Sequence, residues 1–378
     1  MFTIDRVILR EVRLRLKEPF RISSGEVHDR RILLCELEGS GATRTVRAWG
    51  ECVAGERPNY SYETIDTAWP MLAELFVPRV LGKAFVHPRE IAPLLEGDLK
   101  GHRMAKASLE MAGWELFAQL EGVPLAQVLG GERREVEAGI SLGLQATPAE
   151  LLVKAQAAVD RGYRKIKIKI RPGADLEYLT ALRRGLPPGT PLAVDANAAY
   201  TPADSEHLKR FDPIGMLMME QPLEGEDLLR HARLQKELVT PLCLDESITS
   251  LNRAADMIEL GAGKIINIKP GRVGGFAASI AIHDLCREHG IPVWCGGMLE
   301  SGIGRAHNVA LASLPNFCLP GDLSPSERYW QQDVVTPEWT MDDHGRVRVP
   351  WDRPGMGVEV DREHLDRITV RSQELRPS

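Results

Sequence analysis

The stretch YRKIKIKIRPG, residues 163–173, places lysines at positions 165, 167 and 169 with an isoleucine after each one. Strict alternation of apolar and charged residues predicts a β-strand, because successive side chains of a strand point to opposite faces. One face of this strand would be made of isoleucines and the other of three ammonium groups. The sequence around the stretch indicates whether the lysine face meets solvent or a site that needs positive charge.

From about residue 132, short apolar runs alternate with amphipathic helical stretches such as TPAELLVKAQAAVDRG and GFAASIAIHDLCREHG. The eight runs are EAGISLG, RKIKIKI, PLAVDAN, GMLMMEQ, PLCLDES, KIINIKP, IPVWCGG and NFCLPGD. Strands that alternate with helices form a parallel sheet, and eight of them favour closure into a barrel. We therefore predict an α/β fold with a (β/α)₈-type barrel over residues 126–325.

The first third of the chain has a different pattern. Alternating strand patterns, a hairpin about Gly39–Gly41 and a turn-rich loop at EPFRISSGE precede helical patterns over 62–80 and 102–122. This order predicts a separate α+β unit over residues 1–125. Residues 326–378 are punctuated by Pro and Gly, and we expect them to pack back on that unit.

The composition excludes several classes of function. A net charge of −6 without a dense Lys/Arg patch argues against nucleic-acid binding. The N-terminus alternates apolar and charged residues, so we expect no signal peptide, and no segment has membrane-spanning length. The six cysteines lack metal-type spacing, which predicts reduced, mostly buried thiols and a cytoplasmic location.

A polar residue ends each of five successive runs: Lys169, Asp195, Glu220, Asp245 and Lys269. Their spacing of 24 to 26 residues matches one βα unit, so all five should project from the carboxyl ends of adjacent strands around one mouth. A single Asp or Lys at a strand end is more often a helix cap or a salt bridge. Five at matched spacing, in this order, favour a functional site.

Three converging carboxylates resist ionising together unless a hard dication lies between them. Ligation by oxygen alone favours Mg²⁺, with Mn²⁺ or another divalent cation as the alternative. Such a cation can hold a substrate carboxylate and stabilise the enediolate that forms when the α-proton leaves. Lys169 and Lys269 would face opposite sides of the α-carbon, as two bases of a racemase or as one base and one cationic stabiliser. Burial and a nearby Mg²⁺ would lower the pKa of such a lysine.

We expect Lys167 and Lys165, the other two lysines of residues 163–173, to lie in different surroundings. Lys167 would lie one layer below Lys169, where it can hold a substrate carboxylate or tune its neighbour. Lys165 begins the strand, and we expect it to be a solvent-facing charge.

The motifs KIK (167–169), VDAN (194–197), MEQP (219–222), LDES (244–247), INIKPGRVGG (266–275) and WCGGMLESGIGRAHN (294–308) closely resemble the enolase superfamily. Within it they resemble the branch of o-succinylbenzoate synthases and N-acylamino acid (N-succinylamino acid) racemases. The resemblance spans the whole chain and implies an N-terminal capping domain completed by the C-terminal segment, a homo-oligomer and a small carboxylate substrate. It also implies metal ligation by Asp195, Glu220 and Asp245, and acid/base roles for Lys169 and Lys269.

The same resemblance suggests supporting and substrate-binding residues. Lys167, Asn197 and Glu246 would support the site: Asn197 toward the metal shell, and Glu246 on Lys269 or on a metal-bound water, unless they are structural hydrogen-bonders. Two loops, 19–30 and 50–62, would cover the mouth. The candidate substrate contacts are Phe20, Tyr60, Ser141, Arg272 and Met298, with Ser141 directed at a remote succinyl carboxylate and Arg272 favouring racemisation.

Several alternatives stay open. Dipeptide epimerases and muconate-type cycloisomerases use the same lysine pair, although an epimerase usually shows Asp-x-Asp where this chain has only Asp322. His307, a conceivable late-barrel base, lies in a helical pattern where it would cap or pack. A non-catalytic barrel is disfavoured because both lysines are present. Racemisation and o-succinylbenzoate synthesis share proton abstraction, so the residues do not separate them.

Overall fold

The computed structural model describes residues 1–22 and 25–377. In this part of the chain, a curled sheet of seven parallel strands has the order β12-β11-β10-β9-β8-β7-β6. Neighbours in the sheet are therefore neighbours in sequence, as the alternating pattern predicts. The strands are β6 (Gly139–Leu142), β7 (Lys165–Lys169), β8 (Leu192–Asp195), β9 (Met218–Glu220), β10 (Leu242–Leu244), β11 (Ile265–Ile268) and β12 (Val293–Cys295).

The eighth predicted strand, NFCLPGD, is wrong as a strand. Residues 316–322 make only single parallel bridges, from Phe317 to Val293 and from Gly321 to Ala138. Pro320 has no N–H to donate, so a continuous ladder cannot form beside it. Gly321 still exchanges hydrogen bonds with Glu137 O (3.0 Å) and Gly139 N (2.6 Å), so this segment spans the gap between β12 and β6.

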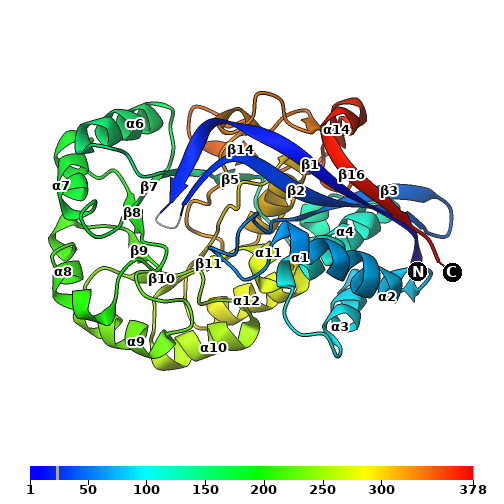
Figure 1. The fold of residues 1–378 in the computed structure, drawn as a ribbon, viewed down its shortest axis with the longest axis horizontal. Coiled ribbons are helices and arrows are strands. Elements are labelled where there is room, and N and C mark those ends of the chain that lie inside the picture. Colours follow the sequence, from blue (N-terminus) through cyan, green and yellow to red (C-terminus); the bar gives the residue numbers. More distant parts are fainter. Residues whose placement is uncertain (23–24, 378) are drawn as a thin grey trace.

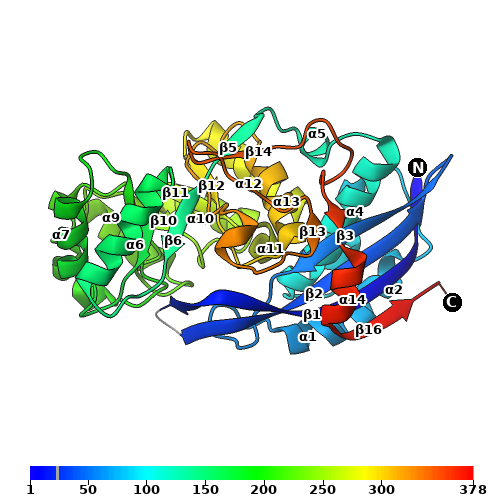
Figure 2. The ribbon, with the colours of Figure 1, turned by 90° about the horizontal axis from the view of Figure 1, so that it is seen from above.

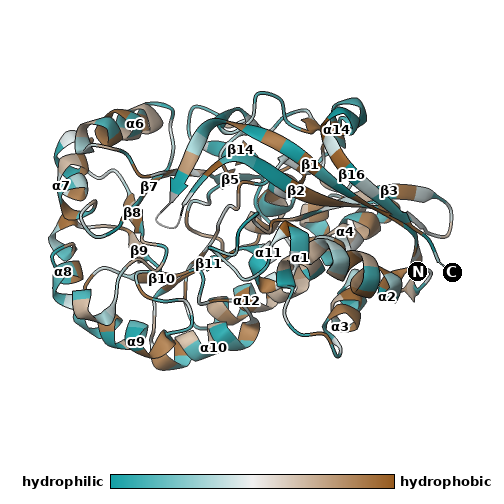
Figure 3. Ribbon diagram, in the orientation of Figure 1, coloured by the Kyte–Doolittle hydropathy of each residue, from teal (hydrophilic) through white to brown (hydrophobic). Residues whose placement is uncertain are grey.

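Helices surround the sheet and bury its outer face (Figure 1). They carry hydrophobic and hydrophilic residues on different faces, which explains their contact with both the sheet and solvent (Figure 3). Thr147, Asp227 and Ser250 cap three of them at the N-terminus. The helices are α6 (Pro148–Asp160), α7 (Leu176–Gly185), α8 (Ser205–Lys209), α9 (Leu228–Glu237), α10 (Leu251–Leu260), α11 (Pro270–Val273), α12 (Phe276–Glu288) and α13 (Gly302–Ala312).

The N-terminal unit is an antiparallel sheet packed on helices. Its strands β1 (Phe2–Ile22), β2 (Gly25–Ser40) and β3 (Thr45–Cys52) are consecutive in the sheet, and β4 (Ala84–Phe85) pairs with β1. The long helix α4 (Arg103–Glu121) lies on β3 so closely that a Cβ at Gly50 would be 1.9 Å from the Ser108 carbonyl oxygen. The remaining helices are α1 (Ile65–Pro70), α2 (Val77–Val80), α3 (Ile91–Glu96) and α5 (Leu125–Leu129), with a π-helical turn at Met71–Phe76.

The C-terminal segment contacts both units. Strand β14 (Arg346–Arg348) pairs with β5 (Glu135–Glu137) at the start of the barrel, and β16 (Thr369–Leu375) pairs antiparallel with β1. Helix α14 (Arg362–Ile368) connects the last two elements, β15 (Glu359–Val360) and β16, while β13 (Val335–Thr336) pairs with β15. The N- and C-terminal ends consequently lie on the same side of the molecule, away from the barrel (Figures 1 and 2).

The first predicted loop, 19–30, is wrong as a loop. Its described residues continue the β1–β2 hairpin, in which Phe20 pairs with Val27, and positions 23–24 lie outside the described residues. The hairpin extends from the N-terminal sheet to the barrel (Figure 2), where Leu144 N donates to Arg21 O at 3.2 Å. A strand pair therefore reaches the barrel mouth after strand β6.

Two expectations from composition agree with the structure. All six cysteines are free thiols; Cys318 is exposed and the others are buried. No helix within residues 1–22 and 25–377 combines the length and the apolar character that crossing a bilayer requires.

Candidate active site

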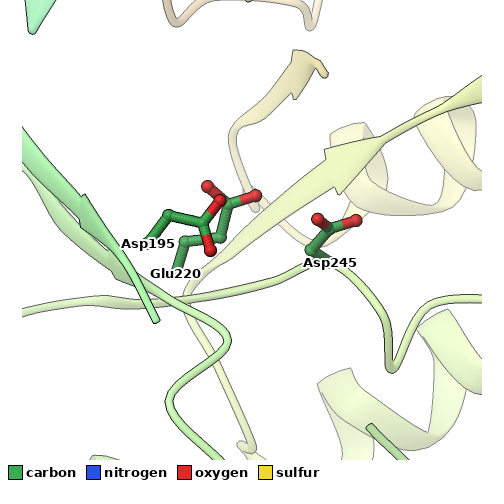
Figure 4. A group of neighbouring side chains, drawn as sticks. All are labelled: Asp195, Glu220 and Asp245. Atoms are coloured by element: carbon green, nitrogen blue, oxygen red, sulfur yellow. The ribbon is translucent and has the colours of Figure 1, made fainter. Parts of the chain in front are cut away.

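Three buried carboxyl groups meet at the carboxyl ends of adjacent strands. Asp195 and Glu220 end β8 and β9, and Asp245 follows β10, with one oxygen of each within 4.8 Å of the others. Figure 4 shows the Asp195 and Glu220 carboxyl groups next to each other and Asp245 to one side. Hard oxygen donors packed this closely fit a divalent cation, because a positive charge between them would offset their repulsion.

Lysines lie on both flanks of the carboxylates. Lys169 Nζ, on β7, is 2.5 Å from Asp195 Oδ2 and donates to Asn197 Oδ1 at 2.7 Å. Lys269 Nζ, directly after β11, donates to Asp245 Oδ2 at 2.8 Å and to the Tyr60 hydroxyl at 3.0 Å. Strands β8, β9 and β10 separate β7 from β11, so the two ammonium groups reach the cluster from opposite sides.

Burial and charge divide the carboxyl groups electrostatically. Burial, with the nearby Asp195 carboxylate, raises the pKa of Glu220 to about 8. Burial also opposes ionisation of Asp195 and Asp245, but the adjacent lysines, joined at Asp245 by Arg272, outweigh it and lower the pKa of both. The pKa of Lys269 is raised, because Asp245 outweighs the opposing effect of burial. The expected lowering of a lysine pKa by burial and a bound Mg²⁺ stays a prediction for the metal-loaded site.

The predicted supporting residues contact the cluster. Lys167 Nζ donates to Glu220 Oε2 at 2.8 Å and is 3.4 Å from Asp195 Oδ2. Asn197 Nδ2 donates to Glu246 Oε1 at 3.0 Å, so Glu246 is connected to the Lys169 side of the site through Asn197, whereas the resemblance suggests a place for it on Lys269 or on a metal-bound water. Glu246 Oε2 is buried without a hydrogen-bond partner among the described residues, and burial raises the pKa of this carboxyl to about 7.

The prediction for Lys165 is wrong. Its side chain is fully buried, because the lysine face of β7 points into the barrel along its whole length. Burial lowers the pKa of Lys165 to about 8. The alternation in the sequence identified the face correctly but not that both ends of the strand are enclosed.

The five substrate-binding candidates divide into two groups. Tyr60 and Arg272 touch the cluster: the Tyr60 hydroxyl donates to Asp245 Oδ1 at 2.8 Å, and Arg272 pairs with Asp245. Both line a cleft of about 770 Å³ between the N-terminal unit and the barrel, together with Asn197 and Glu246. Arg272 therefore acts on a carboxylate of the cluster and does not point freely toward a substrate.

The remaining candidates are farther from these contacts. Phe20 and Met298 are half-buried and pack against the hydrophobic cores. Ser141, in β6, has a buried hydroxyl with no hydrogen-bond partner within the described part of the chain. His307 is buried in α13 with its ring against Phe276, as a packing residue.

Two further residues contact the site without having been selected from the sequence. Asn267 Nδ2 donates to Glu220 Oε1 at 2.7 Å. Asp322 Oδ2 accepts from Lys167 at 2.8 Å. Asn267 was detectable, because it precedes Lys269 by two residues and so shares its face of the strand, as Lys167 does with Lys169. Asp322 ends the irregular eighth segment, which makes only single bridges, so strand alternation does not predict which way its side chain points.

A barrel of parallel strands, capped by an α+β unit and holding buried carboxylates at its mouth, defines a class of metal-dependent barrel enzymes. Family models for "Enolase C-terminal domain-like" proteins and for the "Mandelate racemase / muconate lactonizing enzyme, N-terminal domain" match residues 150–364 and 4–130. The chain belongs to the enolase superfamily, whose members are enzymes that use a divalent metal.

Individual relatives are similar over nearly their whole length. An o-succinylbenzoate synthase of Geobacillus stearothermophilus is 47% identical over 97% of this chain and 96% of its own. An N-succinylamino acid racemase of an Amycolatopsis species is 46% identical over 97% of this chain and 98% of its own. The crystal structure of an enolase superfamily member from Listeria innocua superposes with a TM-score of 0.94 at 36% identity, covering all of both chains.

Proposed function

We propose that this protein removes a proton α to a carboxylate with the help of Mg²⁺, as an N-succinylamino acid racemase, an o-succinylbenzoate synthase, or both. The observation that carries the proposal is the pair of lysines on opposite flanks of three buried carboxylates. Asp195, Glu220 and Asp245 would hold the cation. When bound, it would supply the positive charge that holds a substrate carboxylate and stabilises the enediolate oxygens.

The lysines would transfer the proton. Each base needs a neutral amine within reach of its own face of the α-carbon, and the separation of β7 from β11 supports one lysine on each face. In a racemase, one lysine would remove the α-proton from one face, and the other, as an ammonium, would deliver a proton to the opposite face; Lys169 and Lys269 would exchange these roles for the reverse reaction. In a dehydratase, one lysine would remove the proton and the other would remain a cation beside the developing charge.

Other residues would orient these groups. Asn197 holds Lys169 and Glu246 in one hydrogen-bonded chain, which supports a positioning role on that flank. Tyr60 connects Asp245 to Lys269 on the other flank. Ser141 offers a hydroxyl that has no hydrogen-bond partner among the described residues, and we assign it to the remote carboxylate of a succinyl group. Phe20 and Met298 would line the side-chain pocket.

Two neighbouring activities are less well supported. An L-Ala-D/L-Glu epimerase of Bacillus subtilis is 25% identical over 80% of this chain, well below the synthase and racemase relatives. The single acid after the eighth segment, Asp322, is already engaged by Lys167 and so is not free to bind a substrate ammonium. A muconate-type cycloisomerase is the second alternative. A cytoplasmic homo-oligomer remains part of the proposal.

Proton NMR in D₂O tests the chemistry. The wild-type protein with Mg²⁺ should erase the α-proton signal of an N-succinyl-L-amino acid, and EDTA should stop the loss. A fall in optical rotation would demonstrate racemisation as well. Conversion of the cyclohexadiene precursor would demonstrate o-succinylbenzoate synthesis. If neither substrate reacts, a dipeptide and a muconate are offered next; turnover of one of these alone would overturn the proposal.

A further inference from the structure

The lowest lysine of β7 is buried without a hydrogen bond. Lys165 has no measurable exposure, and its Nζ has no hydrogen-bond partner among the described residues. Gly139, on the neighbouring strand β6, leaves room for this side chain because it has none of its own. A Cβ at that position would be 2.7 Å from Lys165 Cε. A buried ammonium costs stability unless its charge is compensated, so its contacts indicate its role.

An aromatic ring and a carboxylate supply those contacts. Lys165 Nζ lies 3.4 Å from the ring centroid of Trp294, whose Nε1 donates to Cys243 Sγ at 3.2 Å and so fixes the indole. The same Nζ is 3.7 Å from Asp322 Oδ1. A cation over an indole face is stabilised by the ring, and a carboxylate at this distance adds an ionic attraction without a hydrogen bond.

Asp322 is shared between two ammonium groups. Its Oδ1 faces Lys165, while its Oδ2 accepts a hydrogen bond from Lys167 at 2.8 Å. Asp322 N donates to Cys295 O at 2.9 Å, which ties its backbone to β12. Each oxygen of this buried carboxylate therefore has its own cation.

Lys167 then connects Asp322 to the carboxylate cluster. Its Nζ is equally close, 2.8 Å, to Asp322 Oδ2 and to Glu220 Oε2. If Asp322 had no second cation, both of its oxygens could turn to Lys167 and draw the ammonium away from Glu220. The Lys165 ammonium lies on the Oδ1 side of this carboxylate and attracts that oxygen away from Lys167.

We propose that Lys165 is a positioning residue of the active site that acts through Asp322 to hold the Lys167 ammonium at Glu220. This inference rests on the proposed function for its kinetic consequence but not for its structural one. Lys165 touches neither the substrate region nor the carboxylate cluster, so its effect on turnover passes through Asp322.

Two substitutions and their combination test the proposal. Lys165→Met keeps the length of the side chain over Trp294 and removes the charge. With N-succinylamino acid and saturating Mg²⁺, kcat for α-proton exchange should fall about tenfold with little change in KM, since tenfold corresponds to about 1.4 kcal/mol of barrier. Asp322→Asn should also lower kcat. Adding Lys165→Met to Asp322→Asn should cause no further loss, because the carboxylate through which Lys165 acts is gone.

Thermal melts separate positioning from folding. The melting temperature of Lys165→Met should be lower than that of the wild type, because the buried Asp322 loses one of its two cations, so kcat is compared at temperatures at which both proteins are fully folded. Lys236→Met, an exposed lysine on α9, is the matched control and should leave kcat unchanged. A wild-type kcat in Lys165→Met, or losses that multiply in the double variant, would overturn the proposal.

A crystal structure of Lys165→Met gives a result that does not depend on activity. Asp322 should have rotated toward Lys167, and the distance from Lys167 Nζ to Glu220 Oε2 should exceed the present 2.8 Å. An unchanged distance would overturn the positioning role even if the enzyme is active. A lengthened distance would support it even if the wild type processes no N-succinylamino acid, in which case the proposed function alone has failed.

Discussion

At the scale of single residues, the site depends on groups that orient the carboxylates. Glu220 accepts from Lys167 through one oxygen and from Asn267 through the other, at 2.8 and 2.7 Å. Both oxygens are thereby held in one orientation inside the barrel. Groups that orient metal ligands commonly affect metal affinity as much as the ligands' own geometry does.

Replacing Asn267 should therefore weaken cation binding. Asn267→Ala removes the donor to Glu220 Oε1, which frees the carboxylate to rotate and makes it easier to protonate. We expect the dissociation constant for Mg²⁺ to rise roughly 10- to 100-fold in calorimetric titration. Asn252→Ala, on the exposed side of α10, is the control. A constant within twofold of the wild type would show that Asn267 does not orient Glu220.

Gly296 provides the space that Lys269 occupies. A Cβ at this position would be 2.3 Å from Asn267 Oδ1 and 2.7 Å from Lys269 Cε. Gly296→Ala should displace the lysine and lower kcat by at least about tenfold, or about 1.4 kcal/mol of barrier. Steady-state kinetics check this, with Gly41→Ala in the β2–β3 turn as the control. Full activity in Gly296→Ala would mean that Lys269 tolerates displacement and does not need its present position.

Residue identity was the part of the site most accessible from the sequence. The spacing of Lys169, Asp195, Glu220, Asp245 and Lys269 is enough to place them at one mouth, since each βα unit adds a similar length. Lys165 was misassigned because periodicity gives the face of a strand and not the depth of burial at its ends. The partners of Arg272 depend on side-chain packing, which no local pattern encodes.

At the scale of elements, buried glutamates join the N-terminal unit to barrel helices. Glu51, at the end of β3, accepts from Ser301 Oγ at 2.6 Å and from the backbone of Ser301 and Gly304 at the start of α13. Glu110, on α4, accepts in the same way from the first backbone amides of α12. Orphan amides of two barrel helices are thus satisfied across the interface.

Glu51 should make stability depend on pH. Burial raises the pKa of Glu51 from 4.5 to about 8, so the folded state holds a proton that the unfolded state loses at lower pH. The stability that this residue contributes is fully present below about pH 4.5 and is lost as pH rises through about 8.

A neutral variant isolates that contribution. Glu51→Gln keeps an acceptor for α13 but cannot ionise. The free energy of unfolding of the variant minus that of the wild type should therefore increase by at least about 1 kcal/mol from pH 5 to pH 8. Denaturant titrations at both pH values measure the difference, with Glu121→Gln on the exposed end of α4 as the control. A difference that does not change with pH would contradict the raised pKa.

The order of the elements was predictable, whereas their regularity was not. Alternation of apolar runs and amphipathic helices gives the parallel sheet directly. The eighth run looked equivalent to the other seven, but Pro320 interrupts its donors and leaves single bridges. The EPFRISSGE segment has turn-type residues, yet pairing with the opposite strand extends the hairpin to the barrel.

At the scale of the whole molecule, the active site belongs to both structural units. Tyr60 comes from the N-terminal unit, and its hydroxyl joins Asp245 and Lys269 of the barrel. The opposite flank, with Lys169 and Asn197, consists of barrel residues in its closest contacts. Among the contacts of the described residues, the N-terminal unit thus reaches Lys269 directly through Tyr60.

Removing this hydroxyl should therefore affect one hydrogen transfer more than the other. Tyr60→Phe should slow exchange at the enantiomer served by Lys269 about tenfold, with a smaller effect at the other. Exchange rates of the two pure enantiomers measure this, and Tyr62→Phe, exposed on the same loop, is the control. Equal slowing of both enantiomers would contradict a contact confined to the Lys269 flank.

The measurement that tests the central claim most directly is α-proton exchange in D₂O with each enantiomer of an N-succinylamino acid separately, for Lys169→Ala and Lys269→Ala. Two bases on opposite flanks predict that the wild type exchanges both enantiomers and that each variant exchanges only one, a different one in each case. Neither variant should racemise. A variant that still exchanged both enantiomers would contradict the assignment of one lysine to each face of the substrate.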